Sequence, residues 1–176
     1  MESEQAVAAD KRLVVEDLAH VRALVDATKQ RVSCPKDNEK RKECYSGKKK
    51  QFTIKTQFVI DEEWQIKAIS ESVAGAEHDK TLSNELHTLE HLPDGCELDA
   101  DKGYQGLEKQ VGLVTVIDPA TGEKQEIACL TVQTPYKKPK GSELTEEQMA
   151  FNAQLSAIRV RIEHCIGWAN CHPDLF

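Results

Sequence analysis

The sequence lacks the features of a membrane-spanning, exported or disulfide-linked protein. No apolar run approaches the ~18 residues that a transmembrane helix needs. The start, MESEQAVAADKR, is acidic and does not have the basic-then-apolar order of a signal peptide. The six cysteines form no CxxC pair, and neither His164-Cys165 nor Cys171-His172 has a familiar zinc-ligand spacing. We therefore expect a cytoplasmic protein with no membrane partner, whose thiols are buried or idle.

The composition is that of one folded domain with an uneven distribution of charge. The 176 residues are 39% hydrophobic and 30% charged, which suits a single domain with a buried core. The net charge is −7, yet the segment 29–50 holds nine basic and three acidic residues, a net +6, so the remainder carries −13. This basic segment either contacts phosphate or is simply a solvated loop.

Alternating hydrophobicity predicts strands in the first part of the chain. HVRALVDAT indicates a short strand over 21–25 that is buried on both faces, with Asp26 at its end. The segment 29–50 has no periodicity and contains a proline and a glycine, so we predict a long basic loop. QFTIKTQFVID alternates cleanly and a second strand follows a turn, so 51–72 is expected to be an antiparallel hairpin.

The middle of the chain predicts a helix followed by further strands. Leucines recur on one side of DKTLSNELHTLEHL, which indicates a helix over 79–92. CELDADKGYQG suggests a strand that ends near Asp101. VGLVTVID with PATGEKQ resembles a small hairpin, IACLTVQTPY a strand and KKPKG a loop. The element order favours an α/β fold with a mixed sheet, in which the later strands are parallel.

The last predicted element is a long helix. Thr145 and Gln148 form a capping box at its start, and Pro173 is expected to stop it. Its apolar stripe consists of Phe151, Leu155, Ile158, Ile162 and Ile166.

Three acidic residues lie at the edges of these apolar elements. Asp26 and Asp101 follow apolar strands, and Glu163 flanks the helical stripe. A carboxylate near apolar surroundings is costly unless it is paired or binds metal, so the three suggest a site for Mg²⁺ or Mn²⁺. The alternatives are a turn residue at Asp26, a turn cap at Asp101, and an ion pair of Glu163 with Arg159 one helical turn earlier.

Five motifs in order resemble the DDE transposases of the insertion-sequence and PIF/Harbinger type. They are SGKKKQFTIKTQFVID, SESVAGAEHDKTL, LDADKGYQGL, YKKPKG and FNAQLSAIRVRIEHCIG, and the resemblance covers about 21–168. It implies an RNase H-like fold with a mixed five-stranded sheet flanked by helices. It divides the chain into a polar leader at 1–20, a DDE catalytic domain at 21–170 and a short tail at 171–176.

The resemblance also implies the site residues and the chemistry. Asp26, Asp101 and Glu163 match the catalytic triad, and Asp79 matches a further acid that assists the metals. Two Mg²⁺ or Mn²⁺ ions would support DNA cleavage and strand transfer. The implied partners are DNA and other transposase copies, through self-association or pairing with full-length protein, with nucleoid association during activity. Candidate DNA phosphate contacts are Lys48, Lys49, Lys50, Lys137, Lys138 and Lys140.

Three hypotheses remain open at the level of sequence. The first is an active metal-dependent transposase or nuclease. The second is a truncated, inactive remnant that keeps the fold, because few residues precede the first strand and the last helix gives way to GWANCHPDLF. The third is an unrelated domain whose acids are surface residues.

Overall fold

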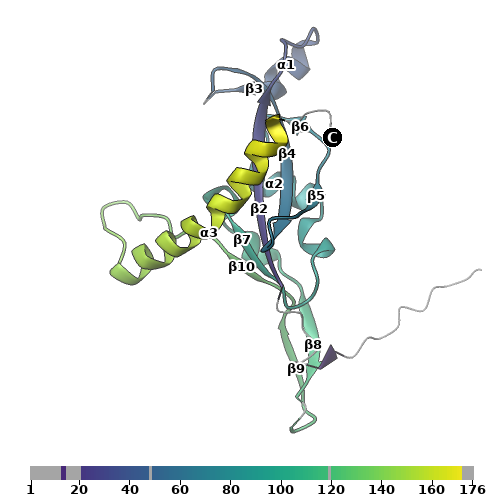
Figure 1. The fold of residues 1–176 in the computed structure, drawn as a ribbon, viewed down its shortest axis with the longest axis vertical. Coiled ribbons are helices and arrows are strands. Elements are labelled where there is room, and N and C mark those ends of the chain that lie inside the picture. Colours follow the sequence, from purple (N-terminus) through teal and green to yellow (C-terminus); the bar gives the residue numbers. More distant parts are fainter. Residues whose placement is uncertain (1–12, 15–20, 48, 119, 172–176) are drawn as a thin grey trace, which may run out of the picture.

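A mixed sheet forms the centre of the computed structural model, which describes residues 13–14, 21–47, 49–118 and 120–171 (Figure 1). The strands are β1 (Leu13–Val14), β2 (Arg22–Arg31), β3 (Tyr45–Ser46), β4 (Gln51–Asp61), β5 (Ile66–Ile69), β6 (Val73–Ala74), β7 (Glu97–Ala100), β8 (Leu113–Ile117), β9 (Lys124–Ala128) and β10 (Thr131–Gln133). The helices are α1 (Asn38–Cys44), α2 (Asp79–Glu85), the 3₁₀ turns η2 (Thr88–His91), η3 (Lys102–Tyr104) and η4 (Leu107–Gln110), and α3 (Glu146–Cys171).

The order of the main sheet is the RNase H-like one. β10, β7, β2 and β4 are neighbours in that order, and β5 pairs with the other edge of β4. β2 is antiparallel to β4 but parallel to β7, and β7 is parallel to β10. The short strands β3 and β6 extend the outer edge of β4. The expected α/β fold with a mixed sheet and parallel later strands is therefore confirmed.

Helices cover both faces of this sheet. On one face α3 packs on β2 and β4 through a cluster of Leu24, Phe58, Ile60, Ile162, Ile166 and Ala169. On the opposite face the turns η3 and η4 bury Tyr104 and Leu107 against Val25, Val59, Leu98 and Ala100. Because successive strand residues point to opposite faces, β4 contributes alternate residues to the two clusters. The strand is buried from both sides, including its polar face.

A second, three-stranded sheet projects from the main one. β8 and β9 form the hairpin that the sequence predicted, and β1 adds to β8 in parallel. The hairpin turn is closed by Asp118, whose Oδ1 accepts hydrogen bonds from the backbone N–H groups of Ala120 and Thr121. Figure 1 shows this hairpin extending away from the main sheet.

The predicted start of the final helix is also confirmed. Thr145 N–H donates to Gln148 Oε1 at 3.1 Å, and Gln148 N–H donates to Thr145 Oγ1 at 3.2 Å, which is the reciprocal pairing of a capping box. The apolar stripe packs on the sheet through Ile162 and Ile166, and Leu155 of the same stripe is also buried. Pro173 and the predicted tail at 171–176 lie, apart from Cys171, outside the described residues.

The basic segment and the first strand differ from the prediction. β2 continues to Arg31, because β4 supplies a partner for every residue up to the pair Arg31 and Thr53. Asp26 is therefore in the middle of a strand rather than at its end. The segment 29–50 is not one loop, since it contains the end of β2, then α1 and β3. The helix α1 is capped by Asp37, whose Oδ1 accepts from Lys40 N–H.

Two later elements are shorter than predicted. The helix expected over 79–92 divides into α2 and η2, because His87 between them takes a left-handed conformation with φ 51°. The strand expected over IACLTVQTPY is split between the end of β9 and the short β10. No helix among the described residues has the length and apolarity needed to cross a membrane.

Candidate functional site

Asp26 and Asp101 are brought together by the parallel pairing of β2 and β7. The last paired residues of the two strands are Val25 and Ala100. Asp26 directly follows Val25, and Asp101 directly follows Ala100. Asp26 shares its side of β2 with Leu24, which packs under α3. Asp101 follows β7 directly and begins η3. The predicted placement of Asp101 at a strand end is thus what the structure has.

Arg159 of α3 binds both aspartates at once. Its Nη1 donates to Asp101 Oδ1 at 3.1 Å, and its Nη2 donates to Asp26 Oδ2 at 3.1 Å. The exposed fractions of the side chains are 12% for Arg159, 19% for Asp26 and 41% for Asp101. The planar guanidinium can hold two carboxylates in a fixed arrangement because its donors form a rigid fork. Two negative charges therefore share one positive charge under α3.

The surroundings of Asp26 favour a positive partner. Burial raises the pKa of the Asp26 carboxyl above its ordinary value, Arg159 and the N–H of Ala27 lower it, and the charges of Asp101 and Asp79 raise it again. The second oxygen, Oδ1, accepts from Ala27 N–H at 2.8 Å. The Nε of Arg159 is buried and has no hydrogen-bond partner among the residues that the structure describes.

Glu163 does not join the two aspartates. It lies one helical turn after Arg159 and is exposed. Within the described part of the chain it forms no hydrogen bond or ion pair, and Arg159 binds the aspartates rather than Glu163, so the alternative i, i+4 pair is not formed. Its assignment as a catalytic residue and metal ligand stays a prediction.

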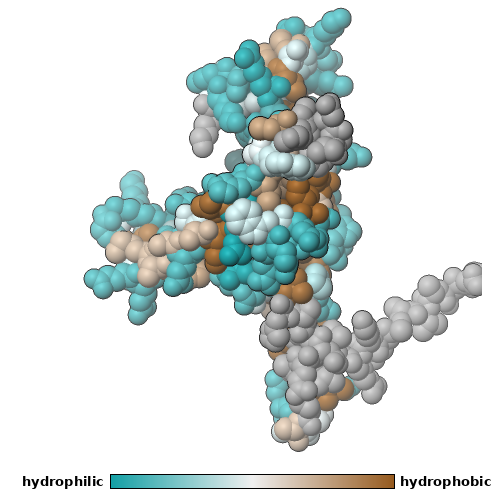
Figure 2. All heavy atoms as spheres, viewed as in Figure 1, coloured by the Kyte–Doolittle hydropathy of each residue, from teal (hydrophilic) through white to brown (hydrophobic). Residues whose placement is uncertain are grey.

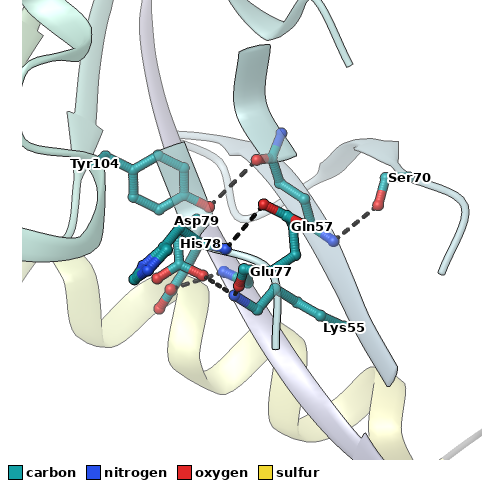
Figure 3. Close-up of polar contacts among 9 residues, drawn as sticks. Lys55, Gln57, Ser70, Glu77, His78, Asp79 and Tyr104 are labelled. Atoms are coloured by element: carbon teal, nitrogen blue, oxygen red, sulfur yellow. Dashed lines mark hydrogen bonds and ion pairs between the residues drawn. The ribbon is translucent and has the colours of Figure 1, made fainter. Parts of the chain in front are cut away.

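Asp79 lies on the opposite face of the sheet from Arg159. It is the first residue of α2, and its Oδ1 accepts from Lys55 Nζ of β4 at 2.7 Å (Figure 3). Lys55 also donates to the backbone oxygen of Glu77. Asp79 touches the turn after Asp101, because a Cβ built on Gly103 would lie 2.2 Å from Asp79 Oδ2. Asp79 thus supports η3, and its role toward a metal stays a prediction.

A second buried polar group lies beside this pair. Tyr104 of η3 donates from its hydroxyl to Gln57 Oε1 at 3.3 Å (Figure 3). Gln57 Nε2 in turn donates to Thr88 Oγ1 at 2.6 Å. Burial raises the pKa of Tyr104, and the nearby carboxylates of Asp79, Asp26 and Asp101 add to the rise. The phenol therefore stays neutral and holds η3 against β4. Its only sequence signal is its place in ADKGYQG.

Sequence reasoning missed Lys55 and the bridging contact of Arg159. Lys55 is almost completely buried, although it stands on the polar side of an alternating strand. Another ion pair, between the partly exposed Arg22 and the buried Asp99 with Nε and Oδ2 2.6 Å apart, links β2 to β7 just before the two site aspartates. A charged residue inside an otherwise apolar strand is a usable signal, but its partner depends on the packing of distant elements.

The two aspartates fit a divalent cation only in part. Carboxylate oxygens are the ligands that Mg²⁺ and Mn²⁺ prefer. Two of them face a shared cation here, so the donor chemistry suits a metal. In the described residues, however, no group of three or more His, Cys, Asp or Glu side chains is arranged to hold a metal ion. Arg159 binds both carboxylates, and Glu163 forms no hydrogen bond or ion pair with a described residue.

The cysteines take no part in the site. Cys96 is buried in the core, and burial raises its pKa to about 11, so its thiol is neutral. Cys165 lies on α3, and its thiol donates to the backbone oxygen of Trp64. These observations agree with the expected buried or idle thiols for the two residues concerned.

The predicted phosphate contacts fall into two separate groups. Lys49 and Lys50 are exposed next to β3, and Lys48 lies outside the described residues. Lys137, Lys138 and Lys140 are exposed on the loop before α3, where Lys138 pairs with Glu143. These two places are well separated in Figure 1, and Figure 2 shows hydrophilic surface over both regions.

Comparison with known proteins found a matching family and a similar protein. Residues 25–170 match the family described as DDE superfamily endonuclease. Over 146 residues the chain is 32% identical to a protein of Microchaete diplosiphon described as "Probable transposase for insertion sequence element IS702". The alignment covers 80% of this chain and 43% of that relative, so the chain spans less than half of the relative's length. No solved structure matches the chain.

Proposed function

Because the chain belongs to the DDE superfamily endonucleases, we propose that it is the catalytic domain of a transposase. Its substrate is the phosphodiester backbone of DNA, which it would cut and rejoin by metal-dependent phosphoryl transfer. The observation that carries the proposal is the pair of carboxylates, Asp26 and Asp101, on neighbouring parallel strands. Both bind the positively charged guanidinium of Arg159. Family membership supports the class of reaction, and this pair supports its location.

The proposed roles follow from where the carboxylates lie. Asp26 is central in the sheet and would contact both metal ions, while Asp101 and Glu163 would hold one each. Asp79 would assist by supporting the turn that follows Asp101. Two bound Mg²⁺ or Mn²⁺ ions would activate the attacking oxygen and stabilise the leaving oxygen. Glu163 is exposed on α3, one helical turn after Arg159, and would complete the set of three carboxylates.

The proposed reaction has two steps. Water attacks a phosphorus atom at the transposon end, the bond to the 3′ oxygen breaks, and a 3′-OH is released. That 3′-OH then attacks a phosphorus atom of the target DNA, the bond from this phosphorus to the target's 3′ oxygen breaks, and a target 3′-OH leaves with the proton. Neither step needs a covalent protein intermediate, so no serine, tyrosine or cysteine nucleophile is required.

The proposed partners are DNA and other transposase copies. The lysines near β3 and before α3 would contact phosphate oxygens without reading sequence. Self-association, or pairing with full-length copies, is proposed as the second kind of interaction.

Metal binding and DNA nicking together test the proposal. The free Mn²⁺ signal in electron paramagnetic resonance should fall when the protein is added, and Asp26→Asn or Asp101→Asn should weaken this binding. With Mn²⁺ and supercoiled plasmid, both variants should lose any nicking that the parent shows. Asp94→Asn is the matched control, since Asp94 is exposed in the turn before β7. Nicking that survives unchanged in both site variants would refute the assignment.

A further inference from the structure

Arg159 has two unusual features in one side chain. It binds both site aspartates, and its own Nε is buried without a partner in the described part of the chain. We propose that Arg159 is an internal counter-cation that occupies the Asp26–Asp101 pair in the metal-free protein and competes with the divalent cation for it. This inference rests on the proposed metal site.

The first argument is the charge of the pair. Two carboxylates on adjacent parallel strands repel each other, and the one at Asp26 is largely buried, so the pair needs positive charge nearby. Arg159 supplies one such charge from α3. Its chain distance from the aspartates is large, with sequence separations of 133 and 58 residues. The contact is therefore a product of the docking of α3 on the sheet.

The second argument concerns which oxygens are taken. Arg159 holds Asp26 Oδ2 and Asp101 Oδ1, and the backbone of Ala27 holds Asp26 Oδ1. Of the four carboxylate oxygens, only Asp101 Oδ2 accepts no hydrogen bond from a described residue. A cation bound by both aspartates must take at least one oxygen that is already engaged. The guanidinium is the partner that can leave, since the Ala27 N–H belongs to a strand.

The third argument concerns the cost of the present arrangement. A buried donor that no protein group satisfies costs free energy, so the Nε of Arg159 adds nothing that holds the guanidinium in place. Release of Arg159 toward water would give its Nε a partner. The contact is therefore a compromise, in which the guanidinium satisfies the aspartates at the expense of one of its own donors.

Direct measurement of Mn²⁺ affinity tests the competition. Arg159→Met keeps the length and apolar stem of the side chain but removes the competing charge. We expect it to bind Mn²⁺ about tenfold more tightly than the parent, because charge-assisted hydrogen bonds no longer have to be broken. Without metal, its melting temperature should be lower than that of the parent. Saturating Mn²⁺ should narrow that difference.

Two further variants make the result interpretable. Arg159→Lys keeps a positive charge but lacks the fork that reaches both carboxylates, so its Mn²⁺ affinity should lie between those of the parent and Arg159→Met. It also serves as the test if Arg159→Met does not fold. Arg161→Met is the matched control on the same helix, because Arg161 donates to the backbone oxygen of Glu62 and not to the site. Its Mn²⁺ affinity should equal that of the parent.

The possible outcomes separate this inference from the proposed function. If the parent binds Mn²⁺ and both Arg159 variants bind it equally or more weakly, Arg159 does not compete, and the inference is wrong while the metal site stands. If neither the parent nor the Arg159 variants bind Mn²⁺, the metal site falls and takes the inference with it. Tighter binding by the Arg159 variants, with no change in Arg161→Met, would support both.

Discussion

The two faces of the sheet carry ion pairs of different kinds. On one face Lys55 and Asp79 form a one-to-one pair, in which the lysine side chain is only 3% exposed and the carboxylate is 30% exposed. On the α3 face, two carboxylates share the single guanidinium of Arg159. The first pair is balanced in charge and fixes the position of α2 and η3. The second has excess negative charge, which is what a cation-binding site requires.

The balanced pair of Lys55 and Asp79 has a structural role, whereas the unbalanced group around Arg159 has the charge of a binding site. Buried ion pairs are costly to desolvate, so a balanced pair is tolerated where it orders the structure. An unbalanced group is stable only while something else supplies positive charge. Asp79 connects the two, because it packs against Gly103 in the turn that follows Asp101.

The largest expected effect on the free energy of unfolding comes from removing one charge of the Lys55–Asp79 pair. Asp79→Asn leaves the buried Lys55 ammonium without a counter-charge, and breaking a buried pair in this way typically costs about 3–5 kcal/mol. Lys55→Met should cost less, because the carboxylate that remains is partly exposed. Urea denaturation gives both free energies of unfolding. The double variant should be more stable than Asp79→Asn alone, and additive losses would show that the two residues are not coupled.

A smaller effect on stability is expected from a divalent cation, which supplies positive charge to the aspartates on the α3 face. Mn²⁺ or Mg²⁺ should raise the melting temperature, since a ligand that binds only the folded state at 100 times its Kd contributes about 2.7 kcal/mol. Asp26→Asn should reduce this gain, because it removes one charge of the pair. Differential scanning calorimetry with EDTA and with millimolar Mn²⁺ measures it. Equal melting temperatures under both conditions would count against a metal site on this face.

The smallest expected effect concerns the lysines that are proposed to contact DNA phosphates. Replacing Lys48, Lys49 and Lys50 with Ala should weaken binding to all duplex DNA sequences alike. For the parent, ~4 phosphate contacts would give a log–log salt slope near −3.6, and the variant should have a shallower slope. Fluorescence anisotropy over a salt series measures both quantities. A Lys109→Ala, Lys124→Ala double variant is the control. Both lysines are exposed and belong to neither lysine group, so the salt slope of this variant should match that of the parent.

A clear preference for one DNA sequence would contradict the DNA prediction. Lysine contacts to phosphate carry no sequence information, so binding by this chain should be independent of sequence. Mg²⁺ should strengthen binding beyond simple screening, because it neutralises the carboxylates that DNA must approach.

Short-range patterns in the sequence determined much of the fold. The capping box at Thr145 and Gln148, the alternation along β4 and the hairpin of β8 and β9 depend on residues close together in the chain. Asp101 was predictable for the same reason, since an apolar strand and a glycine-containing turn bracket it. The roles of the acidic residues came from resemblance to a family rather than from these patterns.

Only the tertiary structure decided the length of β2 and the partners of the charged residues. Pairing with β4 extends β2 to Arg31 and places Asp26 in mid-strand, which no local pattern in VDATKQR indicates. Arg159 could bind Glu163 on its own helix or the distant aspartates. The docking of α3 on the apolar face of β2 and β4 places it over the aspartates. Lys55 appears on the polar side of its strand, and the packing of α2 and η3 buries it against Asp79. Ion partners depend on which elements meet in space, and that information is spread over residues far apart in the chain.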